Sequence, residues 1–111
     1  MQQLHASHPW QVSPALARVI QDELAAEVEC TDRFGPVRHV GGVDIGFEDA
    51  GRITRAVLVI LSFPELTLLE HVIVRRPTRF PYVPGLLSFR EIPGLLQALD
   101  RVRSTPDVIL C

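Results

Sequence analysis

The stretch from Ile53 to Leu61 constrains the fold more than any other part of this 111-residue chain. It is rich in β-branched residues, begins with alternating polar and apolar positions, and becomes apolar on both faces from Ala56 onward. A strand of this kind is covered on both faces, so it belongs near the centre of a sheet. Its apolar run of six residues is far shorter than the roughly 20 residues that a membrane-spanning helix needs.

Two further stretches of strand composition flank this central run. Residues 37–47 carry branched and aromatic residues interleaved with glycines, and residues 67–76 alternate between two faces. Glu48–Gly51 and Phe63–Leu66 have the composition of short turns. Three consecutive strands joined by short turns predict an antiparallel meander.

Helices are expected before and after this meander. Ser13-Pro14 is a helix-start signal, and spacings of three and four over about 14–29 predict an apolar face made of Leu16, Val19, Ile20, Leu24 and Val28. Because Ile92 precedes Pro93, we expect one short helical turn over 87–91 and a separate main helix over about 93–103. Residues 107–111 then form a strand that, after a helical crossover, lies parallel to an earlier one. The predicted fold class is α/β, a mixed sheet with helices packed against it.

The composition is that of a soluble, globular, single-domain protein. Hydrophobic residues make up 47% and charged residues 22% of the chain. The N-terminal stretch Met1–Pro9 has neither the basic start nor the apolar run of an export signal. Cys30 and Cys111 form no disulfide framework and no closely spaced metal-ligand pair. We therefore expect a cytoplasmic protein that has no membrane partner.

The basic residues are unevenly distributed. The net charge of −2 argues against a strongly basic nucleic-acid binder. Between residues 75 and 91, however, four arginines stand against one glutamate, which gives this segment a charge of +3. Guanidinium groups bind phosphate at two points, so we consider these arginines candidate phosphate-binding residues. The alternative is that they only solvate the end of a strand. The candidates are Arg75, Arg76, Arg79 and Arg90.

Asp44 and Glu91 are the candidate catalytic and metal-binding carboxylates. Asp44 lies in an apolar strand, where a carboxylate is costly unless it is paired or bound to a metal ion. Glu91 lies where a second element can bring it to that strand. Converging carboxylates are suited to Mg²⁺, which is bound through oxygen and retains waters for chemistry on phosphates. The alternative is that Asp44 forms a salt bridge with an arginine.

The segment from Phe80 to Glu91 presents an aromatic ring on a stiff loop. Pro81 and Pro84 fix φ on either side of Tyr82, so ordering this loop costs little further entropy. Gly85 then permits a sharp turn or the close approach of another group. A ring in this setting either packs into the core or stacks on or beside a nucleobase.

Two motifs in this chain resemble the endonuclease V family, nucleases specific for deoxyinosine. They are Val43-Asp44-Ile45-Gly46-Phe47-Glu48 and Pro81-Tyr82-Val83-Pro84-Gly85-Leu86-Leu87-Ser88-Phe89-Arg90-Glu91. The resemblance runs from about Val40 to Cys111. It implies a ribonuclease H-like fold, with three antiparallel strands, a crossover helix and a fourth strand parallel to the first. Residues 1–111 would then be the N-terminal part of a single domain of this kind.

The resemblance also implies roles for individual residues. Asp44 and Glu91 resemble two of the acidic Mg²⁺ ligands. A wedge that inserts at the lesion corresponds to Pro81, Tyr82, Val83 and Pro84, and part of the pocket for the flipped hypoxanthine base corresponds to Gly85 and Leu87. The implied activity is Mg²⁺-dependent hydrolysis of a phosphodiester on the 3′ side of deoxyinosine in DNA repair. Some relatives act on inosine in RNA, and these residues do not distinguish DNA from RNA.

The chain departs from the family after its fourth strand. In the family that strand continues into an Asp-Gly-x-Gly segment with another metal ligand, and a catalytic histidine follows later. We therefore expect the 111 residues to be truncated and inactive, or nearly so, alone. Two alternatives remain open: a non-catalytic nucleic-acid-binding module of the same fold, or an unrelated α/β interaction domain. The oligomeric state is not indicated.

Overall fold

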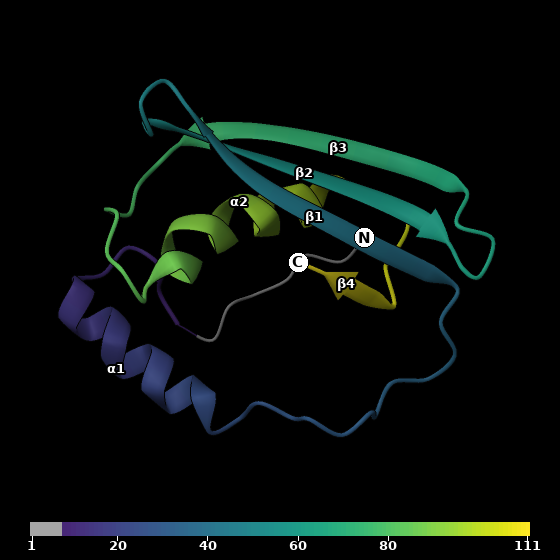
Figure 1. The fold of residues 1–111 in the computed structure, drawn as a ribbon, viewed down its shortest axis with the longest axis horizontal. Coiled ribbons are helices and arrows are strands. Elements are labelled where there is room, and N and C mark those ends of the chain that lie inside the picture. The colour runs from purple at the N-terminus through teal and green to yellow at the C-terminus, as the bar shows by residue number, and fades with distance from the viewer. Residues whose placement is uncertain (1–7) are drawn as a thin grey trace.

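The computed structural model describes residues 8–111, and Figure 1 shows their arrangement. The elements, in order, are α1 (Pro14–Ala25), β1 (His39–Glu48), β2 (Ile53–Ser62), β3 (Leu68–Pro77), α2 (Leu87–Arg101) and β4 (Val108–Leu110). Helix α2 covers one face of the sheet, and α1 lies farther from the sheet near the start of α2 (Figure 1). Within residues 8–111, no helix is both long and apolar enough to cross a membrane. The prediction for residues 1–9 falls mostly on residues 1–7, which lie outside the described part.

The sheet has the topology that the sequence predicts. Its strand order is β3-β2-β1-β4, so the apolar run in β2 lies between two other strands. β1 pairs with β2, and β2 with β3, in antiparallel fashion. β4 pairs in parallel with β1, and this pairing extends only over Val40–Gly42. The meander, the central position of β2 and the parallel fourth strand are therefore confirmed.

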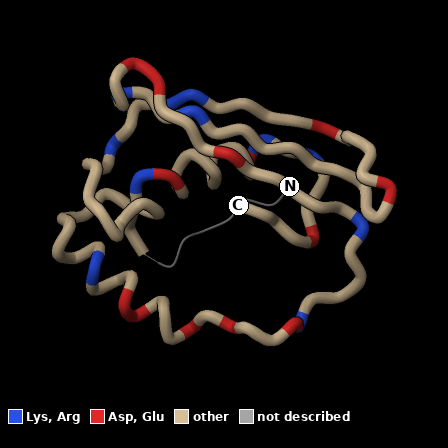
Figure 2. Tube along the Cα trace, viewed as in Figure 1, with Lys and Arg blue, Asp and Glu red and all other residues tan. Residues whose placement is uncertain are grey.

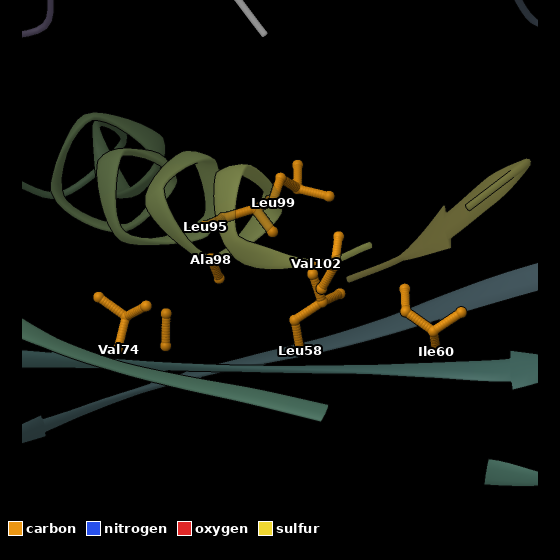
Figure 3. Close-up of a cluster of buried hydrophobic side chains, with 8 residues drawn as sticks. Leu58, Ile60, Val74, Leu95, Ala98, Leu99 and Val102 are labelled. Atoms are coloured by element: carbon orange, nitrogen blue, oxygen red, sulfur yellow. The ribbon is translucent and has the colours of Figure 1, made fainter. Parts of the chain in front are cut away.

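The main core lies between α2 and the face of β2 that carries every second residue. Thr54, Ala56, Leu58 and Ile60 are buried on that face, whereas the residues between them are only partly buried. Figure 3 shows the side chains of α2 directed at this face of the sheet. The buried cluster comprises Ala56, Leu58, Ile60, Val74, Leu95, Ala98, Leu99 and Val102. Alternation along the strands and helical periodicity in α2 thus meet in one apolar layer.

Helix α1 belongs to a second, smaller cluster, away from the sheet. Ser13 caps the helix, because its Oγ accepts a hydrogen bond from the backbone N–H of Leu16 at 3.2 Å. The helix ends at Ala25, earlier than predicted, and three members of the predicted apolar face are exposed: Leu16, Val19 and Val28. The reason is that α1 packs through a narrow face, mainly Ala17 and Ile20, on the 80–86 loop and Phe89.

The prediction of two separate helical segments around Pro93 is wrong. α2 runs without interruption from Leu87 to Arg101, with Pro93 inside it. Proline removes one helical hydrogen bond, but Phe89 and Leu95 on either side of it are both buried, so packing holds both halves in one helix. In addition, Nη1 of Arg76 donates to the carbonyl of Pro93 at 3.2 Å. Tertiary packing therefore overrides the local preference of the residue before proline.

Asp107 fixes the start of the fourth strand against the start of β1. Its Oδ2 accepts hydrogen bonds from the backbone N–H groups of Arg38 at 2.8 Å and His39 at 2.9 Å. Its own N–H donates to the carbonyl of His39 at 2.8 Å. The bonds from Arg38 and His39 lower the pKa of Asp107, and the smaller effect of desolvation opposes them.

Replacing Asp107 with asparagine is expected to destabilise the fold near neutral pH but not in acid. Because the pKa of Asp107 is lower in the folded chain, its carboxylate stabilises the fold above its unfolded pKa of about 3.9. That contribution is lost as the pH falls through the folded pKa. Urea midpoints measured from about pH 7 to about pH 2 test this. Asp32→Asn, at an exposed aspartate, is the matched control; a difference that persists at the acid end would contradict the assignment.

Candidate active site

Asp44 and Glu91 come from two elements that the main core holds together. Asp44 lies on β1 between Val43 and Ile45, which pack against the core, and its own side chain is exposed. Glu91 lies near the start of α2 and is half-buried. β1 has no parallel partner beyond Gly42, so the strand is open along this edge in the described chain. The two candidate carboxylates therefore flank an open edge of the sheet.

The charges of these two carboxylates interact. Partial burial raises the pKa of Glu91 above its ordinary value, the negative charge of Asp44 raises it further, and the positive charge of Arg90 opposes both. Such a shift requires that Asp44 and Glu91 lie within reach of each other's charge. A bound divalent cation would relieve this repulsion and favour the ionised form of both groups.

The donor set suits a hard cation but is incomplete within the described residues. Carboxylate oxygens are the ligands that Mg²⁺ prefers. No group of three or more His, Cys, Asp or Glu side chains within residues 8–111 is placed to hold a metal ion. The alternative that Asp44 is paired with an arginine is wrong for this part of the chain, since none of its ion pairs includes Asp44. Asp44 and Glu91 thus fit as two ligands of a larger site.

The 80–86 loop holds Tyr82 outward from a fixed base. The Tyr82 side chain is 73% exposed, whereas Phe80 and Leu86 at the two ends of the loop are only 5% and 1% exposed. The N–H of Leu86 donates to the carbonyl of Val83 at 3.0 Å. The alternative that this ring packs into the core is therefore wrong, and the stiff, exposed loop expected from the two prolines is confirmed.

One cavity of about 300 Å³ collects the residues predicted for lesion recognition. It is lined by residues 81–87 and Arg90, so the predicted wedge and base-pocket residues all contribute to it. Its volume lies at the lower end of the range of small-molecule pockets. Gly85 has a φ of +87°, and no heavy atom lies within 4 Å of the position a Cβ would take. Glycine is therefore required by the backbone at this point, beside open space.

Arg90 connects this loop to the meander. Its Cζ lies 4.3 Å from the ring centroid of Phe47 and 5.7 Å from that of Tyr82, within the range of cation–π interactions. Its Nη2 donates to the carbonyl of Gly51 at 3.4 Å. Gly51 has a φ of +86°, and a Cβ there would lie 2.9 Å from that nitrogen, so only glycine fits. Arg90 therefore joins the exposed ring, the β1–β2 turn and the neighbouring carboxylate of Glu91.

Two contacts of this site were missed by sequence reasoning. Phe47 supports Arg90 although it is 43 positions earlier in the chain, and Gln21 of α1 donates through Nε2 to the carbonyl of Gly85 at 3.0 Å. Phe47 belongs to the first family motif, but nothing in that motif indicates a cation–π contact. Gln21 has no local sequence signal, because its role depends on where α1 packs.

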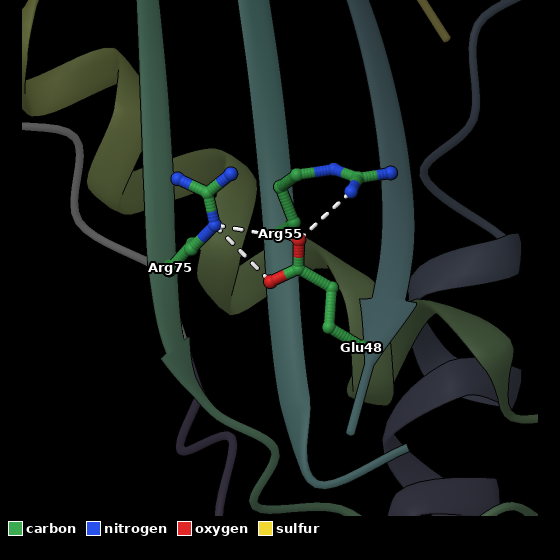
Figure 4. Close-up of polar contacts among 3 residues, drawn as sticks. All are labelled: Glu48, Arg55 and Arg75. Carbon is green, nitrogen blue, oxygen red and sulfur yellow. Dashed lines mark hydrogen bonds and ion pairs between the residues drawn. The ribbon is translucent and has the colours of Figure 1, made fainter. Parts of the chain in front are cut away.

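Arg75, one of the four candidate phosphate-binding arginines, lies apart from the others. Figure 4 shows Arg75 and Arg55 around Glu48, on the face of the sheet opposite α2. The nitrogen–oxygen distances from Glu48 are 3.1 Å to Arg75 and 2.9 Å to Arg55. Desolvation acts to raise the pKa of Glu48, but the hydrogen bonds and charges of the two arginines together lower it. Arg75 is thus already occupied by a carboxylate.

The remaining three arginines gather near the start of α2. Arg76, Arg79 and Arg90 line a second cavity, of about 600 Å³. Nη1 of Arg76 donates to the carbonyl of Pro93 and to Oε1 of Gln97, both at 3.2 Å. Arg79 is exposed. Figure 2 shows basic positions concentrated at this end of the molecule, whereas α1 and the connection after it carry mostly acidic ones.

Comparison with known proteins identifies relatives over nearly the whole chain. The family model described as Endonuclease V matches residues 22–111. Endonuclease V of Trichormus variabilis is 49% identical over 110 residues, which are 98% of this chain and 50% of the relative. Endonuclease V of a Nostoc species is 50% identical over the same shares. The chain spans about half the length of the curated relatives it matches.

Solved structures agree with this sequence relationship. The crystal structure of endonuclease V from Streptomyces avermitilis matches with a TM-score of 0.82 and 36% identity, over 92% of this chain and 46% of that one. A Ciona intestinalis endonuclease V structure, in complex with a 24mer DNA containing an inosine followed by a ribo-adenosine, matches with a TM-score of 0.73 and 26% identity, over 86% and 44%. The mixed sheet with its helices is the ribonuclease H-like fold of these structures. The chain belongs to the endonuclease V family.

Proposed function

We propose that this chain carries the lesion-recognition loop and two metal ligands of a Mg²⁺-dependent endonuclease. The proposed substrate is DNA containing deoxyinosine, and the proposed reaction hydrolyses a phosphodiester on the 3′ side of the lesion. One observation supports this above all. Residues 80–91 present an exposed ring, a cavity and a carboxylate in one short segment, and β1 brings Asp44 within reach of that carboxylate.

The loop would act on a base that has left the duplex. Flipping a nucleotide costs a few kcal/mol, and it costs least at a weakly paired base such as hypoxanthine. Tyr82 would then occupy the gap, because it is exposed and its base is anchored by Phe80 and Leu86. The flipped base would enter the cavity beside Gly85, where backbone groups are accessible for hydrogen bonding. Selectivity would follow from the lower cost of opening the damaged pair.

Asp44 and Glu91 would hold the ion. When bound, Mg²⁺ stabilises the charge that develops on the phosphate and orients water for attack. Arg90 opposes the rise in the pKa of Glu91 and so favours its ionised, metal-binding form. The same side chain contacts Tyr82. Recognition of the base and placement of the carboxylates would therefore be fixed by one guanidinium group.

The sharpest test compares binding to two oligonucleotides that differ at one position. The 111-residue chain is expected to bind a duplex with a single deoxyinosine more tightly than the same duplex with deoxyadenosine, because the cavity selects the flipped base. Fluorescence anisotropy at fixed ionic strength measures both affinities. A matched strand with inosine as a ribonucleotide tests RNA in the same assay. Equal affinity for the two DNA duplexes would overturn the proposed recognition.

A second candidate function is a nucleic-acid-binding module that does not cleave. The observation that favours it is the absence of a complete metal-ligand group within residues 8–111. Strand cleavage measured with Mg²⁺ separates the two: cleavage that Asp44→Asn abolishes supports the nuclease, and inosine preference without any cleavage supports the binding module. Membership of the family excludes the third possibility, an unrelated α/β interaction domain.

A further inference from the structure

The second cavity, of about 600 Å³, lies apart from the predicted lesion site. Its walls come from residues 9–11, the end of β3 and one side of α2. Of the residues predicted for the wedge, the base pocket and the metal, none lines it; Arg90 alone belongs to both cavities. A space of this size falls within the range of small-molecule sites.

Two residues of this cavity carry buried hydrogen-bond donors without a partner. They are Nε1 of Trp10 and Nε of Arg90, and neither has a partner within residues 8–111. Native proteins rarely leave buried polar groups unpaired. Neither an indole nor a guanidinium nitrogen accepts a hydrogen bond, so the partner that both lack is an acceptor. Trp10 is held in place by Phe89, with ring centroids 5.4 Å apart.

The charge of the cavity has the same preference. Three arginines line it against one aspartate, Asp100, which leaves an excess of two positive charges. Arg76 is engaged with Pro93 and Gln97, whereas Arg79 has no hydrogen bond or ion pair within the described residues and is exposed. A cationic site with unpaired donors favours an anion with several acceptor oxygens, and guanidinium groups match phosphate in this way.

We propose that this cavity is a phosphate-binding site, in which Arg79 and the unpaired donors of Trp10 and Arg90 contact phosphate oxygens. A free nucleotide and a nucleic-acid backbone present the same group. As a site for the backbone, the inference rests on the proposed function, and it would place a strand on the side of the loop away from Asp44 and Glu91. As a site for a free phosphate compound, it stands independently.

Trp10 makes this inference directly measurable, because it is the single tryptophan of the chain. Its emission is followed while inorganic phosphate, a 5′-mononucleotide and an undamaged oligonucleotide are added separately at constant ionic strength. At least one of the three is expected to give a saturable change. Saturation by the small compounds identifies a site for free phosphate groups, and saturation by the oligonucleotide alone identifies a site for the backbone.

Two arginine variants show whether the change comes from the cavity. Arg79→Gln is expected to weaken binding about tenfold, the effect of losing one charge-assisted hydrogen bond. Arg18→Gln, at an exposed arginine of α1 that does not line the cavity, is expected to change it by less than about twofold. Arg79→Lys keeps the charge and shows an intermediate loss if the forked geometry matters. Circular dichroism confirms that each variant is folded.

The inference is overturned if none of the three ligands gives a saturable change, or if the two glutamine variants weaken binding equally. This outcome is distinct from failure of the proposed function. Preference for deoxyinosine is measured with a separate pair of duplexes, so a chain that keeps that preference without binding phosphate refutes the second site alone.

Discussion

Replacing Leu58 with alanine is expected to lower the free energy of unfolding by about 3 to 5 kcal/mol. Leu58 is fully buried on β2 and faces α2 across the main core, as Figure 3 shows. The substitution removes apolar contact and leaves a cavity between the sheet and the helix. Because a domain of this size is stable by only about 5 to 15 kcal/mol, the variant loses a large share of its stability.

The same substitution at Leu16 is the matched control. Leu16 is 46% exposed on α1, so Leu16→Ala is expected to change stability by less than about 0.5 kcal/mol. Urea denaturation followed by circular dichroism measures both variants. Comparable losses at the two positions would contradict the conclusion that stability resides in the layer between β2 and α2. The experiment also concerns function, because this layer fixes β1 relative to α2 and hence Asp44 relative to Glu91.

The sheet was predictable because its signals are local. The turn residues between the strands and the apolar character of Ile53–Leu61 each depend on a few neighbouring residues, and all of these predictions are confirmed. The helices were less predictable because packing decides them. Pro93 should divide α2 by local preference, yet the burial of Phe89 and Leu95 keeps the helix continuous. Spacing in α1 likewise could not show that only Ala17 and Ile20 find a partner surface.

The candidate site divides in the same way. Residues 81–87 meet in one cavity because they are consecutive, so a sequence motif captures them. The position of Arg90 between Phe47 and Tyr82, and the approach of Gln21 to Gly85, depend on distant segments meeting in space. Sequence reasoning grouped four arginines by their proximity in the chain, but alternation along β3 directs neighbouring positions to opposite faces. Arg75 therefore meets Glu48, whereas Arg76 meets α2.

Replacing Tyr82 with alanine is expected to lower the preference for deoxyinosine over deoxyadenosine by about 5- to 100-fold. The range corresponds to the roughly 1 to 3 kcal/mol that stacking of a base on an aromatic ring contributes. Affinity for the undamaged duplex is expected to change little, because an exposed ring with no gap to occupy gains few contacts there. Anisotropy titrations with the two matched duplexes give the preference as a ratio of dissociation constants.

Tyr82→Phe keeps the ring and is the control. The hydroxyl group has no hydrogen bond within the described residues, so the preference is expected to stay within about twofold of that of the unmodified chain. Arg90→Gln removes the cation that lies near the ring and is expected to lower the preference in the same direction, by less than Tyr82→Ala, because the two prolines still restrict the loop. If Tyr82→Ala weakens binding to both duplexes equally, the ring contributes general affinity and the wedge role is wrong. A loss confined to the deoxyinosine duplex instead ties discrimination to the one exposed ring that Phe80 and Leu86 anchor from below.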